Sequence, residues 1–130
     1  MIKADGHIFV LETAHTTYCF RRMETGHLEH LYYGRHLTLP EHPAERDVAP
    51  LVEKHTFAPG NTNLCDGEHP AFSLEDMRLE MSSYGKGDIR EPFVEIVHAD
   101  GSITSDFRYE SYEITEKTAE TENGDLPGAY

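Results

Sequence analysis

Alternating apolar and polar residues mark the last third of the chain as β-structure. In residues 103–110, Ile103, Phe107 and Tyr109 alternate with polar side chains. A period of two is typical of a strand with one buried face. Residues 93–98 are also rich in apolar residues, and the Asp-Gly dipeptide at positions 100–101 is a turn signal between the two runs. We therefore predict a β-hairpin over residues 93–114, with Phe107 and Tyr109 on the core face.

The first third of the chain shows the same strand pattern. Residues 8–11, 16–22 and 27–34 are runs of β-branched, aromatic and aliphatic side chains, and the last two flank a Glu-Thr-Gly turn at 24–26. These runs predict three consecutive strands of an antiparallel meander. Together with the hairpin, they predict an all-β fold, an antiparallel β-sandwich.

The middle of the chain shows neither the period of two typical of a strand nor the period of 3.6 typical of a helix. Residues 39–72 contain five prolines and two glycines, and they show neither strand nor helix periodicity. Irregular segments of this length inside a domain are usually functional or disordered. The sequence pattern alone leaves both alternatives open for this segment.

Composition restricts the partners more than it restricts the fold. The 130 residues fit one domain, and 11 basic against 24 acidic residues give a net charge of -13. This acidity argues against nucleic acids and anionic membranes as partners, since both require clustered cations. The sequence contains no apolar run long enough for a signal peptide or a membrane span. Two cysteines do not make a disulfide framework, so we expect free thiols and a cytoplasmic protein.

Candidate chemistry in the sequence is weak. Nine histidines suggest a metal site, but His27 and His30 are three positions apart, and strand positions of that spacing point to opposite faces. Acidic pairs are uninformative in a chain with 24 carboxylates. No nucleophile motif and no phosphate-binding loop occurs. We therefore assign no catalytic residue, no metal ligand and no cofactor, and the residues alone lead only to an all-β domain.

Four motifs carry the argument further. They are HLEHLYYG at 27–34, SYGKGDIREP at 83–92, GSITSDFRYES at 101–111 and LPGAY at 126–130. In this order and spacing, they resemble the N-terminal domain of glycoside hydrolase family 36 α-galactosidases, over essentially the whole chain. The resemblance implies that residues 1–130 are part of an N-terminal β-supersandwich. It also implies that a catalytic (β/α)₈ barrel and a C-terminal β-sandwich lie outside this chain.

The resemblance also implies a function. The family's barrel carries two aspartates that hydrolyse terminal α-galactosides such as melibiose and raffinose with retention. The parent enzyme is thus expected to be an α-galactosidase, while this 130-residue chain alone is expected to be inactive. Many bacterial members resemble homotetramers, in which N-terminal loops approach a neighbour's active site. An incomplete supersandwich would also leave unpaired strand edges, so self-association of this chain is expected, and a strictly monomeric sedimentation profile would count against it.

One charged pair in the irregular segment stands out under this resemblance. Arg46 and Asp47 are candidates for hydrogen bonds to substrate hydroxyls in a neighbouring subunit, and the plainer interpretation is a surface ion pair. Asp88 and Arg90, in the second glycine-bearing loop, fit a structural brace better. An alternative for the whole chain also stays open: a stand-alone carbohydrate-binding or assembly module.

Overall fold

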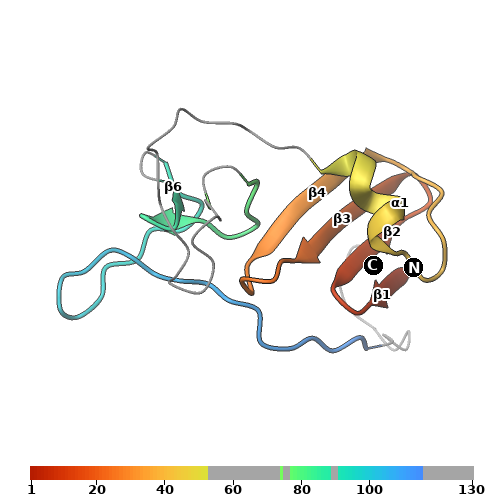
Figure 1. The fold of residues 1–130 in the computed structure, drawn as a ribbon. Helices are drawn as coiled ribbons and strands as arrows, with labels where there is room; N and C mark the ends of the chain where they lie inside the picture. The colour runs from red at the N-terminus through yellow and green to blue at the C-terminus, as the bar shows by residue number, and fades with distance from the viewer. Residues whose placement is uncertain (53–73, 75–76, 89–90, 116–130) are drawn as a thin grey trace, which may run out of the picture.

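The computed structural model describes residues 1–52, 74, 77–88 and 91–115. Its centre is an antiparallel sheet of four strands in the order β1-β2-β3-β4, each joined to the next by a short connection (Figure 1). The strands are β1 (Ile2–Asp5), β2 (Ile8–Glu12), β3 (Thr16–Arg22) and β4 (Leu28–Arg35). The all-β, antiparallel class predicted from the sequence is confirmed.

Three of these strands coincide with the predicted meander, and the turn between β3 and β4 is where the Glu-Thr-Gly motif placed it. Gly26 has a φ of 84°, a conformation that side chains with a Cβ rarely adopt. Strand β1 was not predicted. It pairs with β2 from Ile2 opposite Leu11 to Asp5 opposite Ile8. The Lys3 ammonium ties it down further by contacting the Glu12 carboxylate at 2.9 Å.

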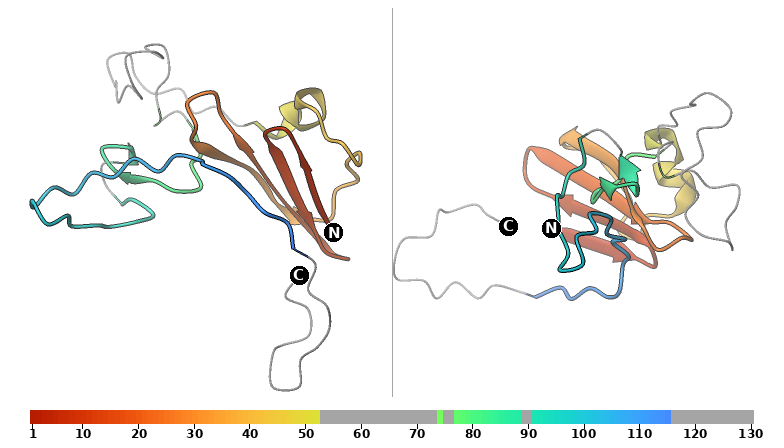
Figure 2. Two further views of the ribbon diagram at one scale, coloured as in Figure 1. Left: turned by 90° about the horizontal axis from the view of Figure 1, so that it is seen from below. Right: turned by 90° about the vertical axis from the view of Figure 1, so that its left-hand side faces the viewer.

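The sheet has two faces with different covers (Figure 2). The main core lies on one face, where α1 (Glu45–Val48) and the 3₁₀ turn η1 (Ala49–Leu51) pack against it. This core consists of five buried residues that share that face: Ile8, Val10, Cys19, Leu31 and Val48. Close packing of such side chains supplies most of the stability of a small sheet domain.

The opposite face is aromatic. Phe9 of β2 stacks on Phe20 of β3 with ring centroids 4.9 Å apart. Residues from the end of the described chain cover this pair: the ring of Tyr112 stands edge-on to Phe9 at 5.1 Å, and Tyr109 lies at 6.1 Å. The extended segment that carries both tyrosines therefore runs across the face opposite α1 (Figure 2).

A second small unit lies beyond the β3–β4 turn. It consists of β5 (Ser83–Tyr84) and β6 (Gly87–Asp88), which pair in parallel. The segment just before it continues the main sheet, because Leu79 bridges to Glu29 of β4 in antiparallel fashion. The exposed edge of β4 is thus partly occupied by residues that no period in the sequence marked as a strand.

The predicted hairpin over residues 93–114 is wrong in its pairing. The turn forms, with the His98 amide donating to the Ser102 carbonyl at 2.9 Å, but neither arm is a strand. The backbone donors of the arms bond elsewhere: Val94 to the carbonyl of Ser82, and Tyr109 to the carbonyl of Gly26. Since each amide has one hydrogen to donate, these bonds separate the arms.

The side-chain part of the hairpin prediction survives. Phe107 and Tyr109 are half-buried, whereas their neighbours in the sequence are exposed. The alternation therefore identified the two partly buried side chains Phe107 and Tyr109, although Ile103 is exposed and the backbone of the arm is extended without a ladder. In the described part of the chain, no helix is long and apolar enough to cross a bilayer.

Candidate functional site

The predicted pair Arg46 and Asp47 lies in the middle of helix α1, and the structure gives its two members different environments. The Asp47 carboxylate accepts the backbone N–H of Ala44 at 2.9 Å and so closes the first turn of the helix. The Arg46 side chain is 87% exposed, and its Nε lies 3.7 Å from Asp47. Arg46 is therefore the member that is available to a ligand, while Asp47 holds the turn.

Helix α1 forms where it does because its far end is apolar. Val48 is completely buried against Ile8, Val10 and their neighbours, and the partly buried Leu51 and Val52 of the following turn pack on the same cluster. Pro50 lies in the first turn of η1, where its missing N–H costs nothing. The helix is thus docked by tertiary packing, and its four residues show no sequence period of their own.

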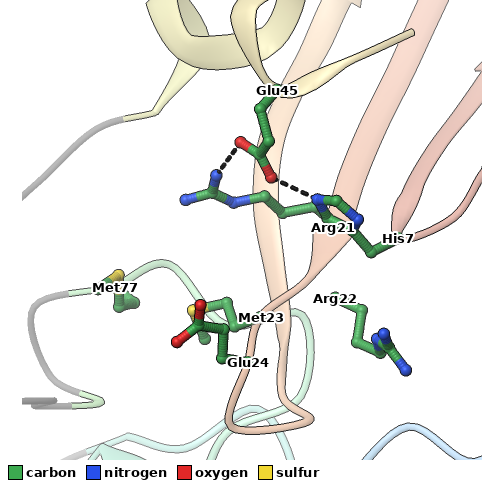
Figure 3. A pocket seen from close by; sticks show the side chains of 7 residues that line it. All are labelled: His7, Arg21, Arg22, Met23, Glu24, Glu45 and Met77. Atoms are coloured by element: carbon green, nitrogen blue, oxygen red, sulfur yellow. Dashed lines mark hydrogen bonds and ion pairs between the residues drawn. The ribbon is translucent and has the colours of Figure 1, made fainter.

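The other end of α1 is held by charge. The Glu45 carboxylate receives the Nη1 hydrogen of Arg21 at 2.6 Å, and its second oxygen lies 2.5 Å from Nε2 of His7 (Figure 3). Arg21 in turn donates from Nε to Glu29 at 2.6 Å. We call these four residues the charge clasp: His7 from the β1–β2 turn, Arg21 from β3, Glu29 from β4 and Glu45 from α1.

The electrostatics of the clasp favour its charged form. Burial works against the charged state of Glu45, but the hydrogen bond from His7 and the positive charge of Arg21 outweigh it, so the pKa of Glu45 is lowered. Burial likewise opposes the charge on Arg21, yet its carboxylate partners raise the pKa of the guanidinium. Glu45 and Arg21 are therefore ionised at neutral pH.

Three clasp residues, His7, Arg21 and Glu45, form one wall of an open hollow of about 610 Å³. The opposite wall comes from the end of β3 and the turn after it, and Met77 lies to one side (Figure 3). The lining mixes two arginines and two carboxylates with the apolar Met23 and Met77. Donors and acceptors beside apolar side chains are the kind of surface that binds polyhydroxylated molecules. Glu45, Arg21 and His7 already satisfy one another (Figure 3).

The two histidines considered as metal ligands have separate partners. His27 is buried between the Thr25 hydroxyl, 2.9 Å from Nδ1, and the Asp106 carboxylate, 2.6 Å from Nε2. His30 contacts Glu80 at 2.8 Å, and the same carboxylate accepts the hydroxyl of Tyr18. Among the described residues, no group of three or more potential ligands is arranged to hold a metal ion.

Sequence reasoning proposed Arg46 and Asp47 as site residues, but it did not identify the three clasp residues outside their helix, His7, Arg21 and Glu29. One signal was available: Cys19, Arg21 and Met23 alternate with residues of the aromatic face, so Arg21 must point to the core side and requires an acid there. Nothing in the pattern, however, says which of many acids it meets. Of the second candidate loop, Asp88 lies in β6, and Arg90 is outside the described residues.

Comparison with known proteins gives consistent relatives. The model of the glycosyl hydrolase family 36 N-terminal domain matches residues 26–130. The chain is 34% identical over 107 residues to the bifunctional α-galactosidase/sucrose kinase AgaSK of Mediterraneibacter gnavus. It is 31% identical over 130 residues to the probable α-galactosidase G of Aspergillus terreus. These alignments cover 82% and 98% of the chain, but only 11% and 14% of the two relatives.

Solved structures agree with the sequence relatives. The galactosidase domain of AgaSK superposes with a TM-score of 0.67 at 28% identity, over 87% of this chain and 15% of that one. An α-galactosidase from Lactobacillus brevis superposes with a TM-score of 0.57 at 29% identity, over 75% of this chain and 12% of that one. Sequence, fold and the order of the motifs thus agree, and the chain belongs to the family of glycosyl hydrolase family 36 N-terminal domains.

Proposed function

We propose that this chain is a non-catalytic part of an α-galactosidase that hydrolyses terminal α-D-galactosyl residues with retention. The observation that carries the proposal is the family match over residues 26–130, in a chain that spans about a seventh or less of relatives named as α-galactosidases. Retaining hydrolysis requires two carboxylates on either side of the glycosidic bond. We assign both to a barrel outside residues 1–130, so that these residues act as scaffold.

The second element of the proposal is assembly into a homo-oligomer, with a homotetramer as the expected parent. Two features support it. Strand β1 is the outer strand of the described sheet, and outer strands offer unpaired backbone groups to another chain. Large apolar side chains on the arms around the 98–102 turn are also solvent-exposed, including Phe93 at 72% and Val97 at 76%.

The third element is a contact with substrate across a subunit boundary. Arg46 is the residue we assign to it, because its guanidinium is exposed on a helix whose own end is docked in the core. A guanidinium presents several donors in a fixed plane and suits neighbouring sugar hydroxyls. Asp47 contributes by keeping the turn closed. The surface ion pair weighed from the sequence is present at 3.7 Å, but at such exposure it stabilises little.

Substitution of Arg46 tests the contact. In the complete enzyme, Arg46→Ala is expected to raise KM for raffinose by about fivefold to thirtyfold with kcat nearly unchanged, since a charged hydrogen bond to bound sugar contributes roughly 1–2 kcal/mol. Michaelis–Menten kinetics measure the effect. The matched control is Arg35→Ala, another exposed arginine at the end of β4, where it pairs with Thr16 at the opposite end of β3 from Arg21. Equal KM values for both variants and the parent would refute the contact.

The proposal also covers the cellular setting. We place the protein in the cytoplasm, with no nucleic acid and no membrane as partner and no cofactor. The acidic composition and the free, buried Cys19 support this assignment, and burial raises the pKa of the Cys19 thiol to about 11. Such a thiol stays protonated and unreactive.

A further inference from the structure

Helix α1 is too short to hold its own position. It has four residues, whereas helices shorter than about 12 residues are marginal in water even with favourable sequences. Its orientation must therefore come from contacts with the sheet. Any residue displayed by the helix is placed only as well as those contacts place it.

Two side chains of α1 reach the sheet, and their spacing fixes the rotation of the helix. Glu45 and Val48 are three positions apart, so they share one face of the turn. Val48 enters the core cluster, and Glu45 enters the charge clasp. Arg46 lies on another face, which explains its 87% exposure. An apolar anchor alone tolerates rolling of the helix, whereas an apolar and an ionic anchor together define one orientation.

The ionic anchor is itself rigid. Arg21 carries its charge on a planar group whose Nε is bound to Glu29, and only 1% of the Glu29 side chain is exposed. The buried Glu29 carboxylate thus fixes the orientation of the guanidinium that contacts Glu45. His7, from the β1–β2 turn, binds the other oxygen of Glu45 at 2.5 Å. The position of the Glu45 carboxylate is therefore set by three separate parts of the sheet.

We infer that Glu45 is a positioning residue for substrate binding: the charge clasp sets the orientation in which α1 presents Arg46 to the galactoside. This inference rests on the proposed sugar contact of Arg46, and it assigns to Glu45, Arg21 and His7 a role that touches no substrate. It also explains why the clasp is present, since Val48 alone could dock the helix without the ionised Glu45 at its start.

The test uses Glu45→Gln, which keeps the shape of the side chain but removes its charge. The matched control is Glu41→Gln, an exposed acid four residues earlier in the same segment. In the 130-residue chain, hydrogen exchange at the Ala49 amide reports the docking of α1, because this amide bonds to the Glu45 carbonyl. In the complete enzyme, KM and kcat for raffinose report the consequence.

We expect Glu45→Gln to speed Ala49 exchange about fivefold and to raise KM about threefold with kcat unchanged, while Glu41→Gln changes neither. Ala49 exchange equal in the two variants would overturn the positioning role, whatever Arg46→Ala does. Suppose instead that Ala49 exchange is faster in Glu45→Gln but that Arg46→Ala leaves KM unchanged. This result would overturn the sugar contact, and the clasp would then only dock the helix. If KM rises in Glu45→Gln but stays unchanged in Arg46→Ala, the inference would be overturned, since Glu45 would then affect substrate binding without Arg46.

Discussion

Arg21→Met is expected to lower the free energy of unfolding by about 3–5 kcal/mol, because it leaves the Glu29 carboxylate buried without a cation. The Glu29 side chain is 1% exposed, and Arg21 Nε lies 2.6 Å from it. Urea denaturation followed by circular dichroism measures the change. The loss reflects the penalty of an orphaned buried charge more than the strength of the pair itself.

Two further variants separate that penalty from other effects. Arg21→Met combined with Glu29→Leu removes both charges and is expected to recover most of the lost stability, since an apolar pair of similar volume fits the interior. Arg22→Met is the matched control: its guanidinium is exposed and lies 5.3 Å over the Tyr109 ring, so a loss within about 1 kcal/mol is expected. A double variant as unstable as Arg21→Met would contradict the buried-charge explanation.

His27→Ala is expected to destabilise the domain by about 2–4 kcal/mol, because it removes the hydrogen bonds to Thr25 and Asp106 and leaves a cavity. His27 joins the β3–β4 turn to the arm that covers the aromatic face, since Asp106 lies three residues before Tyr109. Besides the urea midpoint, exchange of the Tyr109 amide should accelerate, because that amide bonds to Gly26 in the same turn. Exchange at Tyr109 no faster than in the parent would show that the arm is held without His27.

The same contact gives a pH dependence with a definite sign. Burial opposes the charge on Asp106, but the hydrogen bonds from His27 and Arg108 outweigh it and lower the pKa of Asp106. A carboxyl with a lowered folded pKa contributes stability that is present above its unfolded pKa, about 3.9, and is lost as pH falls through the folded value. Stability should therefore decline below about pH 4, and Asp106→Asn, which retains the hydrogen-bonding shape, should decline less steeply.

The fold was predictable where a period of two coincided with local pairing. Strands β2, β3 and β4 follow one another through short turns, so the residues that alternate are also the residues that pair. Strand β1 was missed because Ile2–Asp5 is short and half polar, and its pairing depends on β2 and on the Lys3–Glu12 contact. The hairpin at 93–114 failed because its amides have competing acceptors, such as the carbonyls of Ser82 and Gly26, which no local pattern reveals.

The candidate site likewise combines residues that could be predicted from the sequence with contacts that could not. The resemblance to family 36 pointed to Arg46 and Asp47, and the structure places them on helix α1. The helix itself has no sequence signature, since Val48 and Glu45 are anchored by residues far away in the sequence: His7, for example, lies 38 positions from Glu45. The periodicity of apolar residues does not reveal long-range contacts of this kind, because these contacts depend on which strands lie side by side.

Hydrolysis of para-nitrophenyl α-D-galactoside by the 130-residue chain tests the central claim most directly, namely that these residues support an α-galactosidase without performing its chemistry. The release of nitrophenol is followed at increasing concentrations of the purified chain. We predict a rate equal to that of the buffer blank at every concentration. Turnover above the blank that rises in proportion to the chain would place catalytic groups within residues 1–130 and contradict the account.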